Sequence, residues 1–159
     1  MNHKTRIETF GPVEFVGVAL FGNPETTSFH SAWDYFGEIA DADSISRIAK
    51  DLYGLQLYHP RFPKKFELSY MACMIKEPGM DVPIRMLTKS IPRCKYVVQK
   101  VEGGVKGIDN ALVHLYQNYL PENGLGVAMP IDFEKYCNIK DHESRQDDIE
   151  IWVPVQDVQ

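Results

Sequence analysis

The stretch DIEIWVPV, residues 148–155, decides the fold, because its side chains alternate in character with the two-residue period of a β-strand. Its four β-branched residues share one face, whereas Glu150, Trp152 and Pro154 share the other. We expect the aliphatic face to pack against helices. The opposite face then presents Trp152 beside a carboxylate, which predicts either a ligand wall or a lid over a sheet edge.

The strand before it supplies similar side chains. In IDFEKY, which begins at residue 131, Glu134 and Tyr136 lie on one side. A hairpin of the two strands would place two carboxylates and two aromatic rings on one surface. In the first half of the chain, Glu67 and Met71 share a face of the strand predicted over residues 66–75. Both halves therefore supply a carboxylate for a shared ligand cleft.

Outward from these strands, the order strand, helix, strand, strand occurs twice along the chain. In the first unit, residues 13–20 and 54–58 predict strands. The helix between them presents one apolar face, made by Phe29, Trp33, Phe36 and Ala40. In the second unit, residues 95–101 predict a strand, and a helix starts at about Ile108 and ends before Gly124.

This repeated order predicts an α+β fold of two pseudo-symmetric β-α-β-β units, about residues 8–80 and 92–157, in one domain over residues 1–159. We expect an antiparallel sheet with both helices on one face and the ligand cleft on the other. Trp33 lies on the apolar stripe of its helix, where it either packs in the core or reaches the ligand.

Composition and charge narrow the classes of partner. A net charge of −5 disfavours contact with a nucleic-acid backbone. No apolar run approaches the roughly 20 residues of a membrane-spanning helix, and no signal-type segment is present, so we expect a cytoplasmic protein with no membrane partner. The three cysteines and five histidines show no metal-ligand spacing, and we therefore predict neither a metal nor a cofactor.

The strands FEKY (133–136) and DIEIWVPV (148–155), together with YGLQLYHP (53–60), resemble the GyrI-like small-molecule-binding family. Its members include DNA gyrase inhibitory proteins and the effector-binding domains of AraC-type and MerR-type multidrug-responsive regulators. The resemblance extends over nearly the whole chain. It implies two β-α-β-β units with a ligand cleft between them, which agrees with the element order.

The resemblance also implies the chemistry of the ligand, which would be a hydrophobic cation held by carboxylates and aromatic rings. The matching positions are Glu150, Trp152, Glu134 and Tyr136. The chain departs from the family at Ser69, where members often carry an acidic residue. A carboxylate walled by aromatic rings is poorly solvated, so we expect its pKa to be raised and a bound cation to lower it again.

Three functions follow as hypotheses. The first is a stand-alone binding protein that senses or sequesters hydrophobic, cationic small molecules, because no basic helix-turn-helix segment precedes the first strand. The second is a hydrolase of strained electrophilic natural products, with Glu150 as base and Glu134 or Tyr136 as its partner. The third is a gyrase-inhibitor-like module that acts through protein contacts, which the modest net charge disfavours. We expect a binding protein rather than an enzyme.

Overall fold

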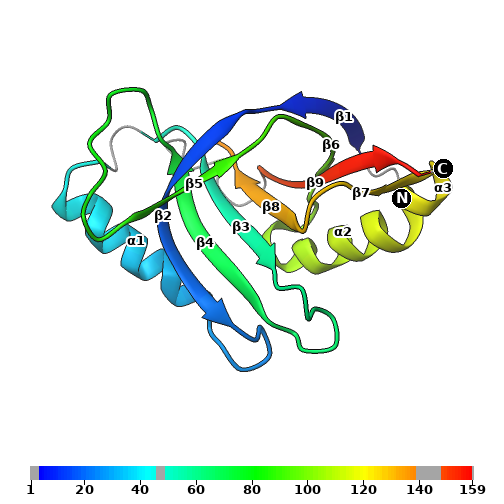
Figure 1. Ribbon diagram of the computed structural model, residues 1–159, viewed down its shortest axis with the longest axis horizontal. Helices are drawn as coiled ribbons and strands as arrows, with labels where there is room; N and C mark the ends of the chain where they lie inside the picture. The colour runs from blue at the N-terminus through cyan, green and yellow to red at the C-terminus, as the bar shows by residue number, and fades with distance from the viewer. Residues whose placement is uncertain (1–3, 46–48, 139–147, 159) are drawn as a thin grey trace.

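The computed structural model describes residues 4–45, 49–138 and 148–158, and its main feature is one strongly curved antiparallel sheet (Figure 1). The strands are β1 (Thr5–Phe10), β2 (Val13–Gly22), β3 (Leu52–Tyr58), β4 (Leu68–Ile75), β5 (Leu87–Ile91), β6 (Cys94–Lys100), β7 (Leu125–Val127), β8 (Ile131–Tyr136) and β9 (Ile149–Asp157).

Two helical segments accompany the sheet. Helix α1 spans His30–Ala42, between β2 and β3. A 3-10 turn, Gly104–Gly107, leads into α2 (Ile108–His114). A π-helical turn, Leu115–Tyr119, then joins α2 to the short α3 (Leu120–Glu122). None of the helices in the described part of the chain is long and apolar enough to cross a membrane.

The strand order confirms the α+β prediction. It runs β1-β6-β9-β8-β3-β4-β2-β5, with β7 paired to β9. Strands β2, β3 and β4 with α1 have the same chain order as β6, β8 and β9 with α2, and the two sets meet where β3 pairs with β8. In the view of Figure 1, α1 lies to the left and α2 to the right of the central strands β3 and β8. Strands β1 and β5 extend the sheet at its two ends.

Both helices pack on the same face of the sheet. The prediction for the last strand is confirmed there, because Ile149, Ile151, Val153 and Val155 of β9 are buried in a cluster with Ile108, Ala111 and Leu115. Helix α1 buries Ala32, Phe36 and Ala40 against alternate side chains of β4, which are Leu68, Tyr70, Ala72 and Met74. Period-two alternation thus sends every second residue of β4 and β9 toward a helix.

The opposite, concave face is filled by aromatic side chains. The rings of Phe15 in β2 and Phe133 in β8 lie 6.2 Å apart, although β3 and β4 separate their strands in the sheet. Trp152 stacks on Phe133 with ring centroids 5.5 Å apart. The sheet therefore curls until residues of distant strands touch. The sequence predicts the ligand cleft on this face, and the structure corrects that placement, because the side chains pack into a closed core instead.

Phe133 provides a test of this aromatic core, because its ring contacts those of Phe10, Phe15, Tyr53, Tyr96 and Trp152. Phe133→Ala should lower the free energy of unfolding by about 3–5 kcal/mol in urea denaturation, since it removes a fully buried ring. Ile84→Ala is the control, because Ile84 is 100% exposed, and it should change the free energy by less than about 0.5 kcal/mol. Equal effects of the two substitutions would contradict the packing described.

Candidate functional site

The candidate site is a groove between α1 and α2, on the helix-covered face of the sheet. It consists of two adjoining cavities of about 410 and 430 Å³. Both are lined by Phe29, Tyr70, Val105, Ile108 and Glu134. The floor comes from the central strands β3, β4 and β8, and the walls come from α1 on one side and the 3-10 turn and α2 on the other. Cavities of this size accommodate drug-sized molecules.

Glu134 of β8 is the acidic centre of the groove, and it is only 5% exposed. The Tyr70 hydroxyl donates a hydrogen bond to its Oε1 atom, and Tyr136 hydrogen-bonds the same carboxyl group. The Trp33 indole N–H donates in turn to the Tyr70 hydroxyl, at 2.9 Å. Burial raises the pKa of Glu134 to about 7, and the two tyrosine hydrogen bonds hold it from rising further. The carboxyl therefore exchanges a proton near neutral pH.

Gly54 explains how Tyr70 and Glu134 reach each other across a strand. It lies in β3, paired with Ala72 of β4 on one side and with Glu134 of β8 on the other. A β-carbon at Gly54 would collide with both the Tyr70 hydroxyl and the Glu134 carboxylate. A glycine inside a strand often marks such a close approach.

Aromatic rings surround this carboxylate. The Phe29 ring stacks on Tyr70 at a centroid distance of 5.6 Å, and the Trp33 ring meets Tyr136 edge-on at 5.4 Å. The faces and edges of such rings offer apolar area, and a ring face attracts a cation within about 6 Å. The groove therefore joins a negative charge to an apolar wall.

A second buried carboxyl group, Asp132, lies two residues before Glu134 on the same face of β8 and is 1% exposed. The hydroxyls of Tyr58 and Tyr116 donate to its Oδ2 atom at 2.6 and 2.7 Å. Burial raises the pKa of Asp132 to about 6, although the two hydrogen bonds act to lower it. Since Tyr116 belongs to the π-helical turn, this contact ties the end of α2 to the sheet.

Glu150 and Trp152 lie on the opposite, concave face, so the expectation that Glu134 and Glu150 share one surface is wrong. In the β8–β9 register Glu150 pairs with Lys135, and Glu134 pairs with Ile151. Paired residues point to the same side, so Glu150 and Glu134 point to opposite sides.

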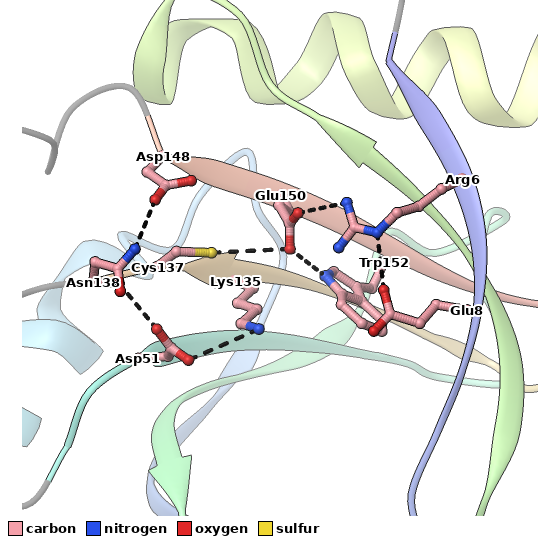
Figure 2. A network of polar contacts seen from close by, with 9 residues as sticks. All are labelled: Arg6, Glu8, Asp51, Lys135, Cys137, Asn138, Asp148, Glu150 and Trp152. Atoms are coloured by element: carbon pink, nitrogen blue, oxygen red, sulfur yellow. Dashed lines mark hydrogen bonds and ion pairs between the residues drawn. The ribbon is translucent and has the colours of Figure 1, made fainter.

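A cation of the chain itself, Arg6, pairs with Glu150, as Figure 2 shows. An Arg6 guanidinium nitrogen lies 2.7 Å from the Glu150 carboxylate, and the Trp152 indole N–H donates to that carboxylate at 3.3 Å. Burial acts to raise the pKa of Glu150, but the contacts with Arg6, Trp152 and Lys135 together outweigh it, and the pKa is lowered. Arg6 and Lys135 also lie 5.8 and 5.6 Å from the centroid of the Trp152 ring. The cation expected beside Glu150 and Trp152 is therefore supplied by the chain itself.

The other residues singled out from the sequence divide between the two faces. Trp33 and Tyr136 line the groove with Glu134. Met71 is buried in the concave aromatic core. Glu67 pairs with Arg61 at 2.5 Å and lines neither cavity of the groove. The groove thus contains three of the seven site residues predicted from the sequence, which are Trp33, Glu134 and Tyr136.

Sequence reasoning missed Tyr70, Phe29 and Asp132 as site residues. Two of them could have been found from the alternation of side chains along β4 and β8, which places Tyr70 and Asp132 on the strand faces turned toward the helices. A carboxyl under a helix needs hydrogen-bond donors, and a tyrosine hydroxyl on a neighbouring strand can supply one. Phe29 carries no such signal, because its ring looks like an ordinary core residue of the α1 stripe.

The fold is similar to three solved structures. SAV2435 bound to tetraphenylphosphonium has a TM-score of 0.73 at 16% identity, over 96% of this chain and 94% of that one. The C-terminal domain of EcmrR has a TM-score of 0.67 at 15% identity, over 99% and 100% of the two chains. A hydrolase from Listeria innocua has a TM-score of 0.60 at 14% identity, over 96% and 92%. At these identities the likeness shows the fold.

Sequence comparison gives the family. The sequence matches none of the curated proteins. Residues 3–156 match the family described as the GyrI-like small molecule binding domain, which is nearly the whole chain. The resemblance found in the C-terminal strands is confirmed, and the chain belongs to the GyrI-like family of small-molecule-binding domains.

Proposed function

We propose that the protein binds hydrophobic cations in the groove between α1 and α2, with ionised Glu134 as their main charged contact, and thereby senses or sequesters them. One observation carries this proposal. Glu134 is a buried carboxylate in an aromatic-lined groove, and no lysine or arginine of the described residues lines either cavity. A buried charge is costly unless it is paired, so a cationic ligand would supply a partner.

The contrast with Glu150 supports the choice of Glu134. Glu150 already has Arg6 as an ion-pair partner, so a ligand cation would have to displace it. Within the part of the chain that the structure describes, the donors to Glu134 are neutral tyrosine hydroxyls, which orient its carboxylate without neutralising the charge. The tetraphenylphosphonium bound to SAV2435, a protein of similar fold, is a lipophilic monocation of the proposed class.

A hydrolase is a second candidate, and the same carboxyl favours it. A group with a pKa of about 7 can accept and return a proton at neutral pH, as general acid–base catalysis requires. The Listeria innocua hydrolase of similar fold adds support. The base would then be Glu134 rather than Glu150, whose carboxylate Arg6 holds. Time-dependent consumption of a ligand by the protein, lost in Glu134→Gln, would distinguish turnover from binding.

Glu134→Gln tests the charged contact. It keeps the shape of the side chain and removes its charge, so the affinity for tetraphenylphosphonium should fall by about tenfold or more, which is about 1.4 kcal/mol. The affinity for triphenylphosphine oxide, a neutral probe of similar shape, should change little. Isothermal titration calorimetry measures both affinities.

Glu150→Gln is the matched control for that experiment, because Glu150 lies on the concave face. It should leave tetraphenylphosphonium affinity within about twofold of wild type. If Glu150→Gln loses the cation and Glu134→Gln keeps it, the ligand site lies on the concave face and the proposal fails.

The affinity should also depend on pH. The pKa of Glu134 is raised to about 7, so its carboxyl is mostly protonated at pH 6 and mostly ionised at pH 8. A cation binds the ionised form, and therefore its affinity should rise about tenfold between pH 6 and pH 8. Fluorescence quenching of Trp33 follows this binding, because the indole lines the groove.

Two other groups bear on this pH profile. His30 also lines the groove, so His30→Gln is the control. The profile should persist in His30→Gln and flatten in Glu134→Gln. Asp132, with a pKa of about 6, adds to the decline only at the acidic end. An affinity that stays constant from pH 6 to 8 in the wild type would contradict ionised Glu134 as the cation contact.

A further inference from the structure

The two cavities of the groove differ in chemistry, although Glu134 lines both. The first cavity continues past Glu134 along Trp33, Leu52 and Tyr136, and this end is mainly aromatic and aliphatic. The second continues along Gln56, Tyr58 and Asp109, whose side chains offer oxygen acceptors beside the apolar residues Phe62, Leu68 and Leu112. A lipophilic cation needs only the first cavity and Glu134, so the second needs a separate explanation.

The acceptors of the second cavity belong to one connected group. Gln56 pairs with Asp132 across the β3–β8 ladder. The Tyr58 hydroxyl lies 3.1 Å from the Gln56 Oε1 atom and 2.6 Å from the Asp132 Oδ2 atom. The hydroxyl has one proton for these two acceptors, and the shorter contact is to the Asp132 carboxylate. When the proton goes to Asp132, the Gln56 carbonyl and the Tyr58 oxygen can accept from a further donor, and both side chains line the cavity. Asp132 adds negative charge directly behind them.

The positions of the charges set a geometry for the ligand. Asp132 and Glu134 are two residues apart on one face of β8, which corresponds to roughly 6–7 Å along a strand. Asp109, in the first turn of α2, adds a carboxylate on the opposite wall. The lining of this cavity thus carries two acidic side chains, Asp109 and Glu134, and no lysine or arginine of the described residues, which favours a positively charged ligand.

We propose that the second cavity is a subsite for a second cationic donor group, such as an amidinium or a protonated amine, so that the groove selects elongated dications over monocations. The inference rests on the proposed function and deepens it. One cationic group sits at Glu134 with its apolar part against Trp33 and Tyr136. The other donates to Gln56 and Asp109 and is attracted by Asp132. An apolar group there would cover the Gln56 carbonyl and the Asp109 carboxylate without offering either a donor, which is unfavourable.

Pentamidine, which carries two benzamidinium groups, and its analogue with one amidinium replaced by a nitrile test the subsite. Calorimetry on the wild-type protein should give at least about tenfold tighter binding of pentamidine. Asp109→Asn should reduce this preference by about threefold or more, because it removes one charge from the subsite. Gln56→Leu is a second variant with the same expectation, and it does not alter the net charge.

Glu38→Gln controls for the general effect of charge, because Glu38 is an exposed acid of α1 that lines neither cavity, and it should keep the wild-type preference. Equal affinities of the two probes for the wild type, with both still dependent on Glu134, would overturn the subsite and leave the proposed function intact. Loss of the preference in Glu38→Gln as much as in Asp109→Asn would also overturn it. Binding of neither probe in a Glu134-dependent way would count against the proposed function itself.

Discussion

The cost of burying the Glu134 carboxyl is the constraint on which the rest of the site depends. A carboxylate removed from water needs hydrogen-bond donors or a cation, and the fold supplies Tyr70 and Tyr136 as neutral donors. The Tyr70 contact is possible only because Gly54 leaves the space between them empty. The result is an oriented carboxyl group with a pKa of about 7 and no lysine or arginine of the described residues in the groove around it, which is the arrangement that the proposed cation binding requires.

Strand alternation lets one short strand build both the core and the site. In β8, Ile131 and Phe133 point into the concave aromatic core, whereas Asp132 and Glu134 point under the helices. The packed concave face supports the strands that form the floor of the groove, because its rings touch across strands that are not neighbours in the sheet. The groove is then shaped by how α1 and α2 are held on the other side, where the Tyr116–Asp132 hydrogen bond fixes the end of α2.

The sequence was sufficient for the element order, the α+β class and the two faces of β9, because these follow from periodicity within single segments. It also identified Glu134, Tyr136 and Trp33. It did not reveal which carboxylate pairs with a cation of the chain, because that depends on the β8–β9 register and on Arg6 in β1, about 140 residues from Glu150 in the sequence. The curvature of the sheet could not be predicted from the sequence either. Because of that curvature, Trp152 packs in a core instead of lining a cleft.

The most direct test of the account is the pKa of Glu134, measured by carbon-13 NMR titration of the carboxyl signal and assigned with Glu134→Gln. We expect a pKa near 7 in the free protein. With saturating tetraphenylphosphonium the pKa should fall by about one unit or more, since a bound cation stabilises the ionised form. A pKa near the ordinary value for glutamate in the free protein, or one unchanged by the cation, would contradict the central role of this carboxyl.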